Sequence, residues 1–305
     1  MMRGRSLWRS YLVIMIGYDT ANAKINLSVD IISKMPDGYH NIKTVMQSIS
    51  LSDEISIECV PGKGISAESG LSYLYSDERN IAVKAAIEFF RCAGIDGYET
   101  RISLDKKIPV CAGLGGGSAD WACVLRILDR MFDTRLGLKT LAVIGKNIGS
   151  DVPFCVSGGT MLAEGRGDVL TSLPPIPDCY IVICKPPFSC STPELFGRVR
   201  CEKIHARPDT GGLIDALGKG DLRGIAQRMY NVFEDLLPRG ARDVAAIKNT
   251  MHDYGALGAV MTGSGPTVLG VFDNEGGARG AYEFLRTEYR ECFFALPVSA
   301  VVRDA

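Results

Sequence analysis

The sequence predicts an α+β fold divided into two domains. Its 305 residues allow one large or two ordinary domains. Extended and helical segments alternate along the chain without the regular strand–helix–strand rhythm of a doubly wound sheet. A proline-rich stretch, LPPIPD at 173–178, interrupts the chain beyond its middle. We therefore expect an N-terminal domain over residues 21–174, a C-terminal domain over 175–305, and a poorly ordered extension over 1–20.

The clearest strand is the segment AKINLSVDII at residues 23–32. Apolar and polar residues alternate along it, which is the period of a strand whose two faces meet different surroundings. We expect a half-buried strand with an apolar face of Ile25, Leu27, Val29 and Ile31 and a polar face of Lys24, Asn26, Ser28 and Asp30.

The remaining elements follow from apolar periodicity and from glycine and proline breaks. In the N-terminal half we expect a turn at 36–38, an extended region over 45–60, a helix over 80–93 that ends at Gly94, a strand over 98–104, a helix over 119–132 and a short helix within 138–149. In the C-terminal half we expect a small sheet with helices on one face: strands at 180–185, within 261–272 and near the end of the chain, and helices near 192–200, 221–230, 241–253 and 277–287.

The composition excludes several classes of function. Lys plus Arg number 34 and Asp plus Glu number 35, which gives a net charge of −1. Without a basic surface field, nucleic-acid binding is not expected. The ten cysteines include no C-x-x-C pair and there are only three histidines. We therefore expect no zinc site, and reduced thiols as in a cytoplasmic protein.

The N-terminus poses a separate question. An arginine-containing leader precedes the apolar segment YLVIMIGY at 11–18, and residues 21–23 (ANA) resemble the cleavage site of a secretory signal. The apolar segment is short for that role, and no other segment has the roughly 20 apolar residues of a membrane span. We therefore expect a cytoplasmic protein that does not bind membranes.

Residues 112–120, AGLGGGSAD, predict a phosphate-binding loop. Glycines let backbone N–H groups turn toward an anion, and the helix that follows adds unpaired N–H groups and the positive end of its dipole. The loop is not a Walker A motif, because no Gly-Lys pair in the chain is followed by Ser or Thr. It is not a dinucleotide fingerprint either, because Ser118 stands where that motif needs its third glycine.

The loop lies within IPVCAGLGGGSADWA at 108–122, which resembles the P-x-x-x-G-L-G-G-G-S motif of the GHMP kinases, a family that includes galactokinase and the homoserine, mevalonate and phosphomevalonate kinases. AKINL near the start and MTGSGPTV near the end resemble two further signatures of that family. The resemblance covers nearly the whole chain. It implies a first domain like domain 2 of ribosomal protein S5 and a ferredoxin-like second domain.

AKINL followed by DGYH is similar to one branch of the GHMP kinases, which acts in the non-mevalonate route to isopentenyl diphosphate. The resemblance implies transfer of the γ-phosphoryl group of ATP, with Mg²⁺, to the 2-hydroxyl of 4-diphosphocytidyl-2-C-methyl-D-erythritol, by a monomer or homodimer. Two alternatives stay open. One is another GHMP kinase, for mevalonate or homoserine, and the other is a binding module that keeps the fold without turnover.

The same resemblance assigns roles to residues. Asp151 would be the general base and Lys24 the cation beside it, whereas from the residues alone Asp151 could be a helix cap and Lys24 a solvated strand lysine. ATP would contact Asn80, Ile81, Lys106, Pro109, Val110, Cys111, Ala112, Gly113, Leu114, Gly115, Gly116, Gly117, Ser118 and Ala119. The acceptor substrate would contact Asn26, Tyr39, His40, Thr192, Pro193, Phe196, Gly263 and Ser264, with Tyr39 and Phe196 on the two faces of the cytosine and His40 hydrogen-bonded to it.

Two positions in and beside the loop leave questions. Ser118 is the one expected contact of Mg²⁺, and no carboxylate of a motif is assigned to the metal. Trp121 stands where the family has a small residue. Its indole would either pack beneath the loop or narrow the nucleotide cleft.

Overall fold

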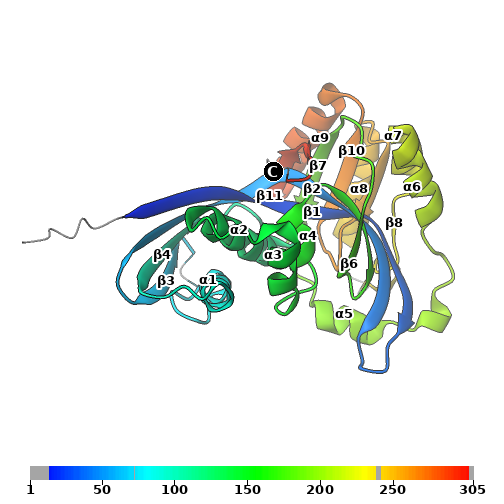
Figure 1. Cartoon of the computed structure of the whole chain (residues 1–305). Coiled ribbons are helices and arrows are strands. Elements are labelled where there is room, and N and C mark those ends of the chain that lie inside the picture. Colours follow the sequence, from blue (N-terminus) through cyan, green and yellow to red (C-terminus); the bar gives the residue numbers. More distant parts are fainter. Residues whose placement is uncertain (1–13, 72, 238–241, 302–305) are drawn as a thin grey trace, which may run out of the picture.

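Two long antiparallel strands, β1 (Met15–Lys34) and β2 (His40–Pro61), run through most of the computed structural model (Figure 1). The predicted turn joins them, and Gly38 within it has a φ of 90°, a left-handed backbone that suits glycine. The structure describes residues 14–71, 73–237 and 242–301.

These two strands are the centre of an eight-stranded sheet. Its main order is β3-β4-β2-β1-β8, while β5 and β12 pair with β2, and β6 pairs with β5. The first half of β2 pairs with β5 and the second half with β4, so a single strand links both parts of the sheet. The bounds are β3 (Gly64–Ser69), β4 (Tyr98–Asp105), β5 (Thr160–Gly165), β6 (Val169–Ser172), β8 (Tyr230–Asn231) and β12 (Pro297–Val298).

Four helices pack on this sheet and on one another: α1 (Ile81–Ala93), α2 (Gly116–Met131), α3 (Gly137–Lys146) and α4 (Val152–Ser157). α1 has the predicted end at Gly94, which adopts the left-handed conformation. At its start the Asn80 side chain accepts a hydrogen bond from the N–H of Ala82. α2 lies along β1 and carries the predicted phosphate loop at its N-terminus. Strands β3, β5, β6 and β8 and helix α4 were not predicted from the sequence.

The second sheet has the order β11-β7-β10-β9 with all neighbours antiparallel. Its strands are β7 (Tyr180–Lys185), β9 (Gly258–Met261), β10 (Val268–Phe272) and β11 (Glu291–Ala295), and its helices are α8 (Arg242–Asp253) and α9 (Glu275–Glu288). The sequence β7-α8-β9-β10-α9-β11 is the β-α-β-β-α-β order of a ferredoxin-like unit. The predicted α+β class and the ferredoxin-like second domain are confirmed.

Both faces of the second sheet are buried, which explains the unbroken apolar run in β7. Val182 and Cys184 join the core under α8 and α9, whereas Ile181 and Ile183 join the core of the first domain. Residues that alternate along one strand therefore serve two cores. The two halves of the molecule are packed together through this sheet.

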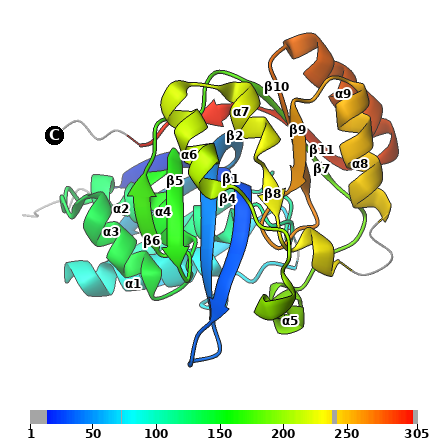
Figure 2. The same ribbon diagram turned by 90° about the vertical axis from the view of Figure 1, so that its right-hand side faces the viewer.

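Three further helices lie between β7 and α8: α5 (Thr192–Arg198), α6 (Thr210–Lys219) and α7 (Leu222–Gln227). α5 and α7 fall within predicted helices, and α6 was not predicted. Figures 1 and 2 show α5 beside the hairpin that joins β1 to β2. Short strands β8 and β12 bring later parts of the chain back to β1 and β2.

Two predictions about the first strand are wrong. Residues 15–20, expected in a poorly ordered extension, lie in β1, where Gly17 packs against α2 and the Thr20 carbonyl accepts a hydrogen bond from Arg126. Residues 1–13 of that extension lie outside the described residues. Residues 23–31 are buried on both faces instead of one, because the polar face lies against other loops of the protein.

Residues 21–23, which resemble a cleavage site, lie inside β1, where the side chains of Ala21 and Ala23 are fully buried. Within the described residues, no helix is both long enough and apolar enough to cross a bilayer.

Candidate active site

A cleft of about 1780 Å³ is lined by residues from both halves of the molecule. It brings together every predicted site residue except Ala119. Ala119 is buried in α2, where the helical period turns its side chain into the core. Trp121 is also fully buried and does not line the cleft. A Cβ at Gly145 of α3 would lie 3.9 Å from its indole, so the ring packs against α3.

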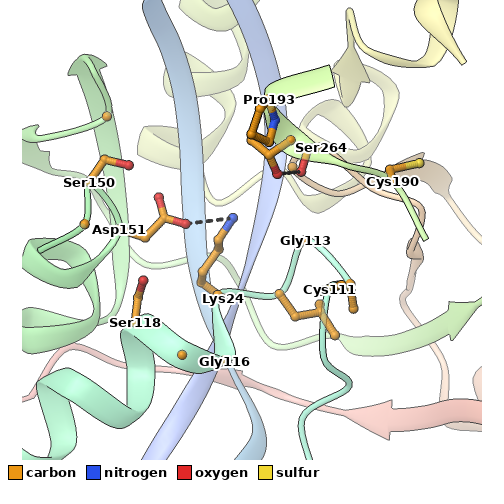
Figure 3. Close-up of a pocket in the computed structure, with 18 of the residues that line it drawn as sticks. Lys24, Cys111, Gly113, Gly116, Ser118, Ser150, Asp151, Cys190, Pro193 and Ser264 are labelled. Atoms are coloured by element: carbon orange, nitrogen blue, oxygen red, sulfur yellow. Dashed lines mark hydrogen bonds and ion pairs between the residues drawn. The ribbon is translucent and has the colours of Figure 1, made fainter. Parts of the chain in front are cut away.

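Lys24 and Asp151 face each other inside this cleft (Figure 3). Lys24 Nζ lies 3.5 Å from Asp151 Oδ2, with side-chain exposures of 6% and 33%. Asp151 occupies the N-cap position of α4, yet its side chain makes no capping hydrogen bond. The carboxylate is therefore directed to Lys24 and the cleft, and Lys24 is not a solvated strand lysine.

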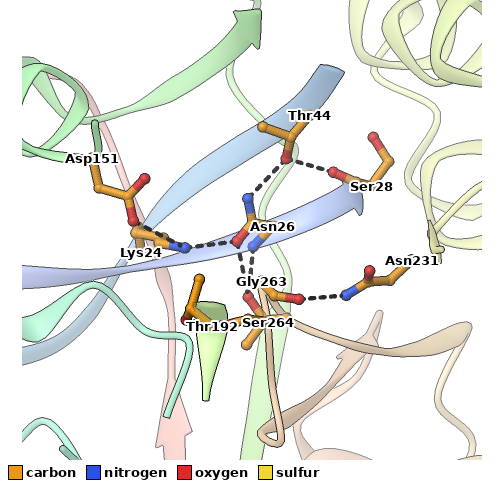
Figure 4. A network of polar contacts seen from close by, with 10 residues as sticks. Lys24, Asn26, Ser28, Thr44, Asp151, Thr192, Asn231, Gly263 and Ser264 are labelled. Atoms are coloured by element: carbon orange, nitrogen blue, oxygen red, sulfur yellow. Dashed lines mark hydrogen bonds and ion pairs between the residues drawn. The ribbon is translucent and has the colours of Figure 1, made fainter. Parts of the chain in front are cut away.

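Asn26 orients this lysine through a buried polar network (Figure 4). Its Oδ1 accepts a hydrogen bond from Lys24 Nζ at 2.8 Å, and its Nδ2 donates to Thr44 Oγ1 at 2.8 Å. Its backbone N–H donates to Thr262 Oγ1. If Asn26 contacts substrate as predicted, that contact must compete with its side-chain hydrogen bonds to Lys24 and Thr44. Sequence analysis missed Thr44 and Thr262, although Thr262 lies in the MTGSGPTV motif.

Strand β8 holds the loop that carries Gly263. Asn231, next to β1 in β8, donates from Nδ2 to the carbonyl oxygens of Met261 and Gly263 at 2.7 and 2.8 Å. Asn231 was not singled out in the sequence, because no local pattern marks it. It connects the second domain's loop to the strand that carries Lys24.

Glycines surround Lys24 where a side chain has no room. A Cβ at Gly113 would lie 2.5 Å from the carbonyl oxygen of Thr262, and one at Gly115 would lie 2.9 Å from Cγ of Lys24. A Cβ at Gly263 would lie 3.0 Å from the Gly113 carbonyl oxygen and 3.3 Å from Lys24 Nζ. The phosphate loop and the Gly263 loop therefore meet backbone to backbone across the lysine.

Lys106 lies behind the phosphate loop in a buried charge cluster with Asp53 and Asp120. Its Nζ is 2.5 Å from a carboxylate oxygen of each acid. Asp53 also accepts the backbone N–H groups of Lys107 and Ile108, which anchors the segment leading into the loop. Lys106, predicted to contact ATP, lines the cleft, but two carboxylates already bind its ammonium. Asp53 was missed, because only the fold shows that it is buried.

The start of α1 forms another part of the cleft wall. Asn80 uses its side chain to cap α1 and to donate to the Tyr75 carbonyl, so both its amide oxygen and its amide nitrogen already have a partner. Ile81 remains partly exposed, and its Cδ1 would be 3.4 Å from a Cβ at Gly117. Tyr75, which sequence analysis missed, is half exposed under the Arg79 guanidinium. These side chains provide an apolar and aromatic wall next to the phosphate loop.

Aromatic side chains line the opposite end of the cleft. The rings of His40 and Phe196 have centroids 5.1 Å apart, and Phe196 packs edge-on against Phe233 at 4.9 Å. Tyr39 is 59% exposed, with the Arg166 guanidinium 4.2 Å from its ring centroid. His40 thus contacts Phe196 directly, and Tyr39 presents an open aromatic surface.

His40 is buried at the end of the hairpin, opposite Lys34 in the strand register. Burial and the nearby Lys34 charge lower the pKa of His40 below its usual value. Its ring is therefore neutral at pH 7 and offers one hydrogen-bond donor and one acceptor. Across the cleft, the hydroxyls of Thr192 and Ser264 are 2.7 Å apart, which links α5 to the Gly263 loop.

Ser118 and Asp151 lie on the same side of Lys24 (Figure 3). A Cβ at Gly149, two residues before Asp151, would lie 3.8 Å from Ser118 Oγ. The described residues contain no group of three or more His, Cys, Asp or Glu that could hold a metal ion. Mg²⁺ in nucleotide sites takes few protein ligands besides phosphates and water. The Ser118 hydroxyl and the Asp151 carboxylate are therefore a suitable ligand set for the Mg²⁺ of a magnesium nucleotide.

Two family models match the chain. The model for the GHMP kinases N terminal domain matches residues 80–159, which contain the phosphate loop and Asp151. The model for the GHMP kinases C terminal domain matches residues 213–291, which contain the Gly263 loop.

Individual proteins are similar over most of the chain. A 4-diphosphocytidyl-2-C-methyl-D-erythritol kinase from Clostridium botulinum (strain Loch Maree / Type A3) is 41% identical over 273 residues, 90% of this chain and 97% of that protein. The crystal structure of a 4-(cytidine 5'-diphospho)-2C-methyl-D-erythritol kinase has a TM-score of 0.79 at 29% identity and covers 92% of this chain and 98% of that one. A homoserine kinase from Cytophaga hutchinsonii, with a TM-score of 0.72 at 18% identity and 98% of both chains covered, shares the fold.

The buried charge cluster predicts how stability depends on pH. Burial, opposed by Lys106 and reinforced by Asp53, raises the pKa of Asp120 from 3.8 to about 7. The folded state thus holds the Asp120 proton more tightly than the unfolded state does. This difference raises the free energy of unfolding below pH 4, and the gain is lost as pH rises toward 7. Because Asn cannot ionise, Asp120→Asn should reduce the decline in unfolding free energy between pH 5 and pH 8, measured by urea denaturation.

Asp133→Asn is the matched control, because Asp133 is exposed beside Arg135 and its pKa is lowered, away from this pH range. It should leave the pH 5 to pH 8 difference unchanged. Equal pH dependence in wild type and Asp120→Asn would contradict the assignment.

Proposed function

The chain belongs to the GHMP kinase family, and on that premise we propose that it phosphorylates 4-diphosphocytidyl-2-C-methyl-D-erythritol, the compound named for its 41% identical relative. The γ-phosphoryl group of ATP passes to the 2-hydroxyl, giving the 2-phosphate and ADP. The reaction is a step of the non-mevalonate route to isopentenyl diphosphate. The ion pair between Lys24 and Asp151 in a cleft with a phosphate loop carries this proposal.

Asp151 is the proposed general base. Its carboxylate caps no helix and is one-third exposed to the cleft, so it is available to accept the proton of the substrate hydroxyl. The hydroxyl oxygen forms a bond to the γ-phosphorus while the bond between that phosphorus and the β–γ bridging oxygen breaks, and ADP leaves. Lys24 places a positive charge beside Asp151, where it stabilises the negative charge that develops on the hydroxyl oxygen.

The phosphate loop and the start of α2 are the proposed ATP phosphate site. The first turn of a helix leaves backbone N–H groups unpaired, and its dipole adds positive potential there. α2 is 16 residues long, and Gly115 at its N-cap brings these groups next to Lys24. The adenine lies against the wall formed by Ile81 and Tyr75. Lys106 acts by anchoring the loop through Asp53.

We include Mg²⁺ in the proposal, with Ser118 Oγ as a ligand and Asp151 beside it. The ion neutralises charge on the ATP phosphates when it is bound. A monomeric or homodimeric state and a cytoplasmic location remain predictions.

The aromatic end of the cleft supports a cytidine substrate. Tyr39 offers an exposed ring face, and neutral His40 offers the donor and acceptor that a cytosine edge requires. Phe196 lies next to His40. For mevalonate or homoserine, which carry no base, such a pocket has no use. The likeness to homoserine kinase concerns the fold alone, so we do not favour either of these substrates.

A binding module without turnover is the other alternative. The chain retains both Lys24 and Asp151 at ion-pair distance, which a protein that only binds does not need. RNA binding through the first domain is disfavoured by the net charge of −1.

Asp151→Asn tests the general base. The variant should bind ATP normally while kcat falls by about 10²–10⁴-fold, because the amide cannot accept the proton. A coupled assay of ADP release gives kcat and KM for ATP. Asp96→Asn, at an exposed position, is the matched control and should match wild type. A wild-type rate for Asp151→Asn would remove this residue from the mechanism.

Phe196→Ala tests the cytidine assignment. Loss of the ring should raise KM for the cytidine substrate about tenfold, the usual effect of removing one base–aromatic contact, with little change in KM for ATP. Phe284→Ala, at a half-exposed position on α9, controls for loss of a surface ring. If Phe196→Ala barely changes either KM, the substrate is not recognised through its base at this end of the cleft.

A further inference from the structure

Arg126 in α2 is a buried cation that lies outside the cleft. Its side chain is only 6% exposed, although arginine is almost never buried unless its guanidinium is paired. Lys24 and Lys106 are equally shielded from solvent, but both of them line the cleft. Because burial of a charge is costly without partners, the groups that hold the Arg126 guanidinium indicate what it does.

The Arg126 guanidinium joins three elements of the first domain, in which α2 packs against both α4 and β1 (Figure 1). Its Nη1 donates to the Cys155 carbonyl in α4 at 2.8 Å, and its Nη2 donates to the Thr20 carbonyl in β1 at 2.9 Å. Its Nε donates to Asp19 Oδ2 at 3.2 Å, so the buried charge has a counter-ion. One planar group on α2 therefore holds α4 and β1 at a fixed separation.

Both carbonyls lie close in the chain to the proposed catalytic pair. Cys155 is one turn beyond Asp151, and its backbone N–H donates to the Asp151 carbonyl at 3.0 Å. Thr20 lies four residues before Lys24 in the same strand. The guanidinium thus connects the helix that begins at the proposed base to the strand that carries the cation.

Helix α4 needs such a partner because it is short. It has six residues, and the last four carbonyls of any helix lack N–H partners within that helix. Arg126 supplies a charged donor to one of these carbonyls, and a charge-assisted hydrogen bond is stronger than a neutral one. The bond to Cys155 therefore fixes α4 one turn away from Asp151.

We propose that Arg126 is a positioning residue that sets the distance between Asp151 and Lys24. This inference rests on the proposed function, because it takes Asp151 as the general base. Arg126 itself lies outside the cleft and takes no part in the transfer of the proton. It holds α4 against β1, so that the carboxylate stays 3.5 Å from the Lys24 ammonium. A misplacement of about 1 Å in such a pair can lower a rate about 10²-fold.

Arg130, one turn further along α2, provides a matched control. It binds the same Asp19 carboxylate at 3.0 Å and donates to the Tyr18 carbonyl. Both of these contacts are with β1, and the Arg130 side chain is 48% exposed. Loss of Arg130 therefore removes a positive charge and two hydrogen bonds to β1 while the bond from α2 to α4 remains.

The test compares Arg126→Gln, Arg126→Lys and Arg130→Gln in the 305-residue chain, with folding checked by urea denaturation. Arg126→Gln should lower kcat about tenfold or more and change KM for ATP and for the cytidine substrate less than about twofold, because α4 shifts while the binding surfaces remain. Arg126→Lys keeps the charge but loses the planar fork, so its kcat should fall by a smaller factor. It decides the test if Arg126→Gln does not fold. Arg130→Gln should match wild type.

A second measurement combines the Arg126 variants with Asp151→Asn. If Arg126 acts through the base, its replacement should lower the residual kcat little further, because residues that act as a unit have non-additive effects. A general defect of the fold would lower kcat by the same factor in both backgrounds.

Equal factors in the two backgrounds, or a wild-type kcat for the folded Arg126 variants, would overturn the inference. So would a loss of kcat/KM that comes entirely from a higher KM. Failure of the proposed function looks different: the wild-type chain would not phosphorylate the cytidine substrate, or Asp151→Asn would keep full activity. An inactive Asp151→Asn together with fully active Arg126 variants refutes the positioning role alone.

Discussion

The active site depends on the close approach of two backbone loops around Lys24. Gly113 lies against the backbone of Thr262 and Gly265, Gly263 lies against the Gly113 carbonyl oxygen, and Gly115 packs on the lysine stem, so these glycines leave little space for a side chain. The ammonium is thereby held at 2.8 Å from Asn26 and 3.5 Å from Asp151. The flexible lysine side chain is therefore ordered before any substrate binds. In the proposed reaction its charge already lies where the substrate hydroxyl becomes negative.

This approach requires both domains, because each contributes one loop. The phosphate loop follows the first domain's β4, and the Gly263 loop joins β9 to β10 of the second sheet. The second sheet is fixed by burial of both faces, and Asn231 ties the carbonyls of its loop to β8, next to β1. The position of Lys24, the proposed catalytic lysine, is therefore a property of the whole fold, and a domain alone would not reproduce it.

Local signals in the sequence predicted the parts of this arrangement better than the contacts between them. The strand at 23–32, the helix end at Gly94 and the glycine loop before α2 each depend on neighbouring residues, and all three occur in the structure, although the strand is buried on both faces. Asn26 was predicted to bind substrate. Its backbone N–H donates to the hydroxyl of Thr262, which is 236 positions away in the chain. No local pattern reports such a partner. The buried position of Asp53 was not predicted for the same reason.

The kcat of Gly263→Ala, with the cytidine substrate and ATP both saturating, tests the central claim most directly. The added methyl group would lie 3.3 Å from Lys24 Nζ and 3.0 Å from the Gly113 carbonyl oxygen, and the φ of 56° at Gly263 disfavours alanine, so the contact between the two loops must shift. We expect a folded variant whose kcat falls about 10²-fold, the usual cost of a small misplacement of catalytic groups. A folded variant with wild-type kcat would contradict the claim that this backbone contact sets the geometry of catalysis.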